Sequence, residues 1–285
     1  MTGLMASLAA VLLAAGPPCA APGTGGVSPR LPSFADGAGL SLALNLPAYR
    51  LDLLDGATLV HSYTVAIGSL RYRTPRGRFA VTRVELNPWW YPPPSRWARR
   101  DTVTPPGPRN PMGRAKLNFH ELYFLHGTPH EASLGTAASH GCVRMASADA
   151  HDLARRVLNA ARPDVPAAVI EAAAHDRRTR RYTLTQPVPL EIVYRTAEVR
   201  EGALELHPDV YRRERTTLRT RALQALREAG IGEESVDAER LADAVRAARR
   251  EHLRVPFDEL LLPAVRDPPR AIDSSIEPPG EGRRP

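Results

Sequence analysis

The sequence is poor in cysteine, lysine and aromatic residues. It has two cysteines in 285 residues, Cys19 and Cys142, which excludes a small domain held together by several disulfides. Lys116 is the one lysine, so arginine carries almost all the positive charge behind the formal net charge of +7. Arginine clusters at 177–181 and 212–221 fit the solvated faces of amphipathic helices. Because the chain also begins like an exported protein, we expect no nucleic-acid partner.

Residues 1–21 predict a secretory signal peptide. An apolar run of about ten to twelve residues precedes small residues there, whereas a membrane span needs about twenty. We therefore expect an exported protein of the periplasm or cell envelope, with no stable membrane span after signal cleavage. A lipid attached at Cys19 is the alternative, although Pro17 and Pro18 make a poor context for it. Cleavage would leave Cys142 as a lone thiol, which suggests a chemical use for it.

The rest of the chain divides by composition and periodicity. Residues 22–37, rich in glycine, proline and serine, predict a linker, and 267–285 predict a disordered tail. Period-two alternation predicts strands at 40–46, 49–54, 59–67, 79–85, 117–125, 167–171, 188–194 and 203–206. Asp55-Gly56 favours a hairpin turn. Helices are expected at about 148–161, where Ser147 is a candidate cap, and from Thr216 onward.

The segment between His126 and Arg144 carries the candidate chemistry. A cysteine becomes a nucleophile as the thiolate, and a nearby imidazole can take its proton and return it to a leaving amine. His126 and His140 are both candidate partners of Cys142. Gly141 would allow a substrate to approach closely and backbone N–H groups to meet an oxyanion. The guanidinium of Arg144 could hold a substrate carboxylate.

A zinc site is the main alternative for this segment, because imidazole and thiolate both suit zinc. Its ligands would be His126, His130, His140 and Cys142. Pro129, however, interrupts the helical spacing that would bring the first two histidines together. No dense pattern of cysteines or carboxylates supports a metal, so we expect no metal and no cofactor. We interpret His130 as a polar loop residue.

The string Ser139-His-Gly-Cys-Val-Arg-Met145, with Leu125-His-Gly-Thr128 before it, resembles the signature of the L,D-transpeptidase catalytic domain. Further matches outside the signature are Leu44–Pro47, Tyr49–Leu51, Thr74–Phe79, Asn87–Trp90, Asn110–Lys116, Val193–Ala197 and Leu206–Tyr211. The last two resemble the continuation found in larger members of the family. The resemblance implies a mainly β protein, a mixed β-sandwich with one or two helices. It covers a catalytic domain at 38–213, and a helical extension at 214–266 would follow.

The resemblance also implies roles for individual residues. Cys142 would be the acyl-accepting nucleophile, and His126 the general base, oriented by the backbone carbonyl of Gly127. The residues implied to shape the oxyanion region and the substrate pocket are Ser139, His140, Gly141 and Arg144.

The family acts on peptidoglycan stem peptides, and the resemblance implies a tetrapeptide stem as acyl donor. A thioester on Cys142 would pass to the amine of a second stem, forming a 3→3 cross-link, or to another amine, with a wall or envelope protein as a possible acceptor. Hydrolysis would instead make the protein an L,D-carboxypeptidase or endopeptidase. A non-catalytic wall-binding scaffold is the third alternative.

Overall fold

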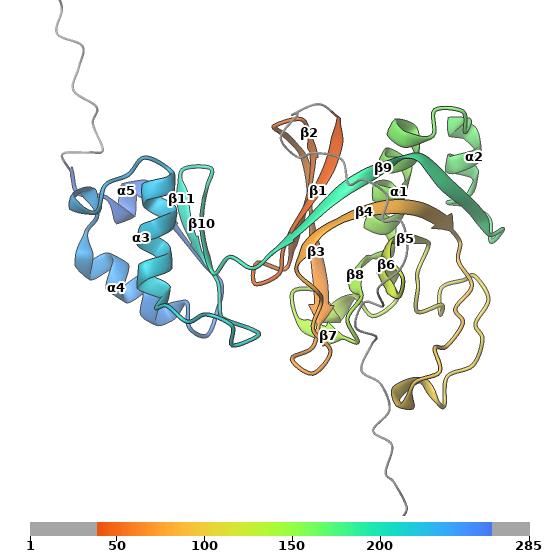
Figure 1. Ribbon diagram of the computed structural model, residues 1–285, viewed down its shortest axis with the longest axis horizontal. Coiled ribbons are helices and arrows are strands. Elements are labelled where there is room, and N and C mark those ends of the chain that lie inside the picture. The colour runs from red at the N-terminus through yellow and green to blue at the C-terminus, as the bar shows by residue number, and fades with distance from the viewer. Residues whose placement is uncertain (1–38, 264–285) are drawn as a thin grey trace, which may run out of the picture.

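The computed structural model describes residues 39–263 (Figure 1). The predicted signal peptide, the linker and the tail at 267–285 lie outside the described residues. Among the described residues, no helix is both long enough and apolar enough to cross a membrane.

A nine-stranded mixed sheet forms the larger part of the molecule. Its strand order is β2-β1-β9-β4-β5-β6-β8-β3-β7, and an additional pairing of β2 with β3 closes the sheet on itself. The strands are β1 (Leu40–Asn45), β2 (Arg50–Asp55), β3 (Thr58–Gly68), β4 (Gly77–Leu86), β5 (Ala115–His120), β6 (Tyr123–Thr128), β7 (Ala137–Ser139), β8 (Val143–Ala146) and β9 (Arg180–Val193). The mainly β class predicted from the sequence is confirmed.

Helix α1 (Ser147–Ala161) packs on this sheet and fills its core. Its buried face includes Leu153, Val157 and Leu158, which belong to one apolar cluster with strand residues such as Leu125 and Val143. Alternate residues of β6 and β8 therefore point toward α1, and the residues between them point to the opposite face. Two short 3₁₀ helices, η2 (Arg96–Ala98) and η3 (Glu131–Ser133), lie in the connecting loops.

Three local expectations were wrong. The strand expected at 117–125 is a hairpin of β5 and β6, because the chain turns at Leu122, whose side chain is exposed. Residues 167–171 form helix α2 (Ala167–Ala172). Alanines favour a helix, and Pro166, with its fixed φ, is well tolerated as the residue just before the first turn of that helix. Ser147 does not cap α1, because its hydroxyl donates to the carbonyl of Thr128 at 3.2 Å.

The sequence predicts a helical C-terminal part, but the structure also contains strands there. Strands β10 (Ala197–Arg200), β11 (Ala203–Leu206) and β12 (Leu253–Pro256) form an antiparallel sheet. It packs with α3 (Leu218–Glu228), α4 (Ala238–Ala247) and α5 (Phe257–Leu260); a 3₁₀ turn, η4 (Glu233–Ser235), lies between α3 and α4. This C-terminal unit starts at Ala197 rather than at 214, because the apolar helix faces need the β10–β11 hairpin to cover them.

Partly buried ion pairs join the C-terminal unit to the nine-stranded sheet. Arg50 on β2 donates to Glu198 and to Glu205, each at 2.7 Å. In the opposite direction, Arg200 pairs with Asp52 on β2 at 3.3 Å. Since these side chains are largely shielded from solvent, their geometry fixes how the two units meet more than it adds net stability.

Candidate active site

The pairing of β6 with β8 brings the two ends of the predicted site together. These strands run parallel, with Leu125 opposite Val143 and His126 opposite Arg144. Leu125 and Val143 are fully buried toward α1, so His126 and Arg144 point to the other face of the sheet. Cys142, which immediately precedes β8, comes to the same region. The sixteen-residue separation in sequence is thus closed by one strand pairing.

His126 is a buried, neutral imidazole. Its exposure is 2%, and Nδ1 lies 2.7 Å from the carbonyl oxygen of Gly127. Because a carbonyl only accepts, Nδ1 carries the proton, and Nε2 is left as the proton acceptor. Burial lowers the pKa of His126 to about 4, with positive charge on Arg144 and Lys116 acting in the same direction. The ring can therefore accept a proton at neutral pH.

The depressed pKa of His126 predicts a loss of stability in mild acid. As pH falls below the ordinary histidine pKa of about 6.5, His126 becomes protonated in the unfolded chain. In the folded chain it stays neutral down to about pH 4. The free energy of unfolding should therefore fall by roughly 3 kcal/mol across this window. Urea unfolding measures the free energy of unfolding at pH 7 and at pH 4.5. The difference between these two free energies should be smaller for His126→Gln than for the parent chain. An unchanged difference would contradict the burial of a neutral ring, and His130→Gln, at an exposed position, is the matched control.

A tight turn presents Cys142 at the start of β8. Gly141 has a φ of 115°, a value that side chains rarely permit, and a Cβ there would lie 2.9 Å from the ring of Tyr123. The hydroxyl of Ser139 accepts from Gly141 N–H at 3.0 Å and donates to the Cys142 carbonyl at 2.5 Å. Ser139 is 1% exposed, so its hydroxyl holds the turn from within, and its contribution to a substrate pocket stays a prediction.

Cys142 is half-buried as a residue, and its Sγ lies 3.5 Å from the carbonyl oxygen of Leu122 in the β5–β6 turn. Arg144, two residues on, interacts electrostatically with both Cys142 and His126. Burial lowers the pKa of Arg144, while the charge of Cys142 acts against that shift. A neighbouring guanidinium favours the thiolate form of a cysteine. Among residues 39–263 no carboxylate pairs with Arg144, which suits it to a carboxylate brought by a substrate.

A row of charged groups crosses the sheet on the face of His126. The strand registers place Glu85 opposite Lys116 and Lys116 opposite His126. Lys116 Nζ and Glu85 Oε2 are 3.1 Å apart, and the Glu85 side chain is 5% exposed. The carboxylate therefore balances the lysine charge beside the imidazole. The sequence marks Lys116 as the one lysine and as the end of the matched segment Asn110–Lys116, but no sequence pattern reveals its cross-strand neighbours.

The other two histidines of the segment have separate surroundings. His140 stacks on Trp97, with ring centroids 4.0 Å apart and planes 5° from parallel. The ring of Tyr72 also contacts His140, with ring centroids 4.8 Å apart. Burial lowers the pKa of His140. The loop between β4 and β5, which carries Trp97, thus borders the site. His130 is exposed, and its backbone N–H donates to the Thr128 hydroxyl, as expected of a loop residue.

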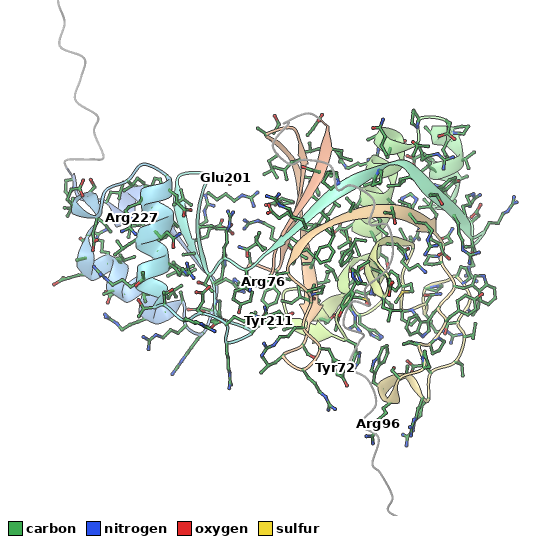
Figure 2. The ribbon with its side chains drawn as sticks, viewed as in Figure 1. Tyr72, Arg76, Arg96, Glu201, Tyr211 and Arg227 are labelled. Carbon is green, nitrogen blue, oxygen red and sulfur yellow. The ribbon has the colours of Figure 1, made fainter. Side chains whose placement is uncertain are left out.

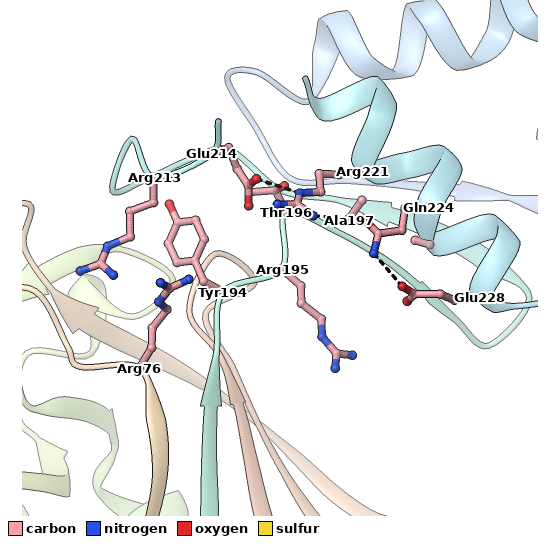
Figure 3. Close-up of a pocket in the computed structure, with 11 residues that line it drawn as sticks. Arg76, Tyr194, Arg195, Thr196, Ala197, Arg213, Glu214, Arg221, Gln224 and Glu228 are labelled. Carbon is pink, nitrogen blue, oxygen red and sulfur yellow. Dashed lines mark hydrogen bonds and ion pairs between the residues drawn. The ribbon is translucent and has the colours of Figure 1, made fainter. Parts of the chain in front are cut away.

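Two features elsewhere resemble ligand sites but do not include Cys142 or His126. Among the described residues, the donor atoms gathered closely enough for a metal ion belong to Glu198, Glu205 and His207. Arg50 already donates to both of those glutamates. A cavity of about 370 Å³ lies at the junction of the two units, where Arg76 and Arg213 approach Tyr194 (Figure 3).

The fold and the site together define a mainly β protein that combines a thiol, a neutral imidazole and a guanidinium in one region, the groups that covalent acyl chemistry uses. Residues 41–180 match the sequence profile of the YkuD family, described as the L,D-transpeptidase catalytic domain. This part of the chain belongs to that family.

Individual relatives carry the same family name. A protein named as an L,D-transpeptidase, YkuD of Bacillus licheniformis, is 29% identical over 44% of this chain and 64% of its own length, so the match spans less than two thirds of that relative. The YkuD protein of Bacillus subtilis is 29% identical over 54% of this chain and 83% of its own. A solved L,D-transpeptidase from Mycobacterium smegmatis aligns at 13% identity with a TM-score of 0.36, over 55% of this chain and 59% of that one.

Proposed function

We propose that the protein is a cysteine-dependent L,D-transpeptidase of the cell envelope, acting on peptidoglycan tetrapeptide stems. The observation that carries the proposal is the placement of Cys142, His126 and Arg144 around one strand pairing, where the Arg144 guanidinium has no carboxylate partner among residues 39–263. Membership of residues 41–180 in the L,D-transpeptidase family supports it. Export to the periplasm or envelope, through the predicted signal peptide, is part of the same proposal.

In the proposed first step, His126 Nε2 takes the thiol proton of Cys142. The sulfur attacks the carbonyl carbon of the third stem residue, a diamino acid, and the oxyanion that forms meets the backbone N–H of Cys142. The bond to the terminal D-Ala then breaks as His126 returns the proton to the leaving amine. Free D-Ala and a thioester on Cys142 result.

In the second step an amine of another stem attacks the thioester, and His126 takes a proton from that amine. The sulfur leaves and regains a proton, so the thiol is restored and a 3→3 cross-link is made. Arg144 would hold a carboxylate of the donor stem near the sulfur, because a guanidinium can bind a carboxylate with two parallel hydrogen bonds.

Purified disaccharide-tetrapeptide tests the proposal directly. Incubation with the protein should release D-Ala and yield a cross-linked dimer, both identified by mass spectrometry. Release of D-Ala with tripeptide alone, even when acceptor stems are abundant, would assign hydrolysis in place of transfer. Binding to peptidoglycan without release of D-Ala would identify a scaffold and overturn the enzymatic proposal.

A further inference from the structure

Tyr211 belongs to a segment that leaves the C-terminal unit and returns to the core of the nine-stranded sheet. It lies between β11 and α3, beyond the matched residues 41–180. Its side chain is fully buried in the main apolar cluster. Its ring stacks on Tyr194 with centroids 5.8 Å apart, and its backbone N–H donates to the Tyr194 hydroxyl at 2.7 Å. Figure 2 shows Tyr211 where the two units meet.

The hydroxyl of Tyr211 holds the two ends of a loop that follows β3. It donates to the carbonyl of Gly68 at 2.6 Å and accepts from the backbone N–H of Thr74 at 3.2 Å. Gly68 is the last residue of β3, and Thr74 comes shortly before β4. One buried phenol therefore fixes the distance between these two backbone positions.

The side chain of Thr74 links this loop to the turn that presents Cys142. It donates to the carbonyl of Gly141 at 2.9 Å and accepts from Gly68 N–H at 2.9 Å. The hydroxyls of Tyr211 and Thr74 each serve once as donor and once as acceptor, so this buried network is fully satisfied. The packing is close, because a Cβ at Gly68 would lie 3.0 Å from Gly141 Cα.

The carbonyl of Gly141 and the N–H of Cys142 belong to one peptide group. Since that group is planar and trans, fixing the direction of the carbonyl also fixes the direction of the N–H. In the proposed acyl transfer, the backbone N–H of Cys142 is the donor aimed at the position where the oxyanion forms. The hydroxyl of Thr74, itself held by Tyr211, thus sets the orientation of the N–H that this chemistry needs.

We propose that Tyr211 is a positioning residue, which orients the Cys142 N–H toward the substrate oxyanion by way of Thr74 and the Gly141 carbonyl. The segment that enters and leaves the C-terminal unit therefore completes a site that otherwise lies within residues 41–180. The inference rests on the proposed function, in which Cys142 is the nucleophile.

Tyr211→Phe tests this inference, with Tyr63→Phe as the matched control. Tyr63 is equally buried, and its hydroxyl donates to Asp152, away from the turn. Two reactions of Cys142 are timed in each variant: acylation by a carbapenem, which needs an oxyanion site, and alkylation by iodoacetamide, which does not. For Tyr211→Phe we expect acylation to slow by roughly 10-fold to 100-fold, with alkylation and apparent carbapenem affinity within about 2-fold of the parent. Tyr63→Phe should leave both rates nearly unchanged.

Substitutions at Thr74 give a second test in case Tyr211→Phe folds poorly. Thr74→Ser keeps the hydroxyl and should retain most of the acylation rate, whereas Thr74→Val should slow acylation as Tyr211→Phe does. Parallel loss of acylation and alkylation would show a purely structural role and overturn the inference, as would parent-like acylation in Tyr211→Phe. A parent chain that forms no carbapenem adduct would instead overturn the proposed function on which the inference rests.

Discussion

Replacing Cys142 with alanine should abolish covalent adduct formation with a carbapenem and the release of D-Ala from tetrapeptide stems. In the proposed mechanism the sulfur carries the acyl chain, so turnover should fall on the order of 10⁴-fold or more. Intact-protein mass spectrometry measures the adduct, and a D-Ala assay measures turnover. The effect should be catalytic only, because Cys142 is half-buried and lies outside the apolar core cluster.

Cys142→Ser and Cys19→Ala serve as controls for this prediction. Serine keeps the size of the side chain but is a much weaker nucleophile here, so Cys142→Ser should also form no detectable adduct. Cys19→Ala should behave as the parent does, because Cys19 lies in the predicted signal peptide. Peptide mapping of an adduct to any residue other than Cys142 would contradict the proposed nucleophile.

Removal of the imidazole at position 126 should give the second largest loss. His126→Ala is expected to slow carbapenem acylation by about 10²-fold to 10⁴-fold, the usual contribution of a general base. The Nδ1 contact with Gly127 at 2.7 Å leaves Nε2 as the acceptor. The pKa of about 4 keeps that nitrogen unprotonated at neutral pH. Stopped-flow measurement of acylation at several pH values reports the rate, and its acid limb should lie near pH 4.

His130→Ala is the matched control, since the two histidines are four positions apart and His130 is exposed. It should acylate within about 2-fold of the parent rate. Equal losses in the two alanine variants would contradict the assignment of His126 as the base. His126→Gln, which fills more of the buried space, separates the loss of the base from the loss of packing, and circular dichroism checks that each variant folds.

Short-range patterns made the candidate site visible in the sequence. Ser139 to Arg144 form a compact string, and His126 stands at the end of an alternating apolar segment, so both could be selected without coordinates. The contacts that organise these residues could not be selected in this way. Thr74 lies 67 positions from Gly141, and Tyr211 lies 137 positions from Thr74. No local pattern predicts pairings at such separations.

The strands and helices likewise fall into those that local sequence patterns predicted and those that they did not. Alternation at period two located β1, β2 and β4 correctly, because each has one face in the core. The short apolar run at 167–171 was predicted as a strand but forms the helix α2, because the helix propensity of its alanines outweighs so short a pattern. The C-terminal sheet was missed because β10 and β11 acquire their third strand, β12, from residues about fifty positions further on.

The sequence by itself determined the class of the fold, the family of residues 41–180 and the residue types available at the site. These depend on local periodicity and on a contiguous string, both of which are properties of neighbours in the chain. The tertiary structure alone decided that β6 and β8 pair, that burial keeps His126 neutral, and that Tyr211 reaches the turn before Cys142. Such features depend on which distant segments share one core, and this is settled only when the whole chain packs together.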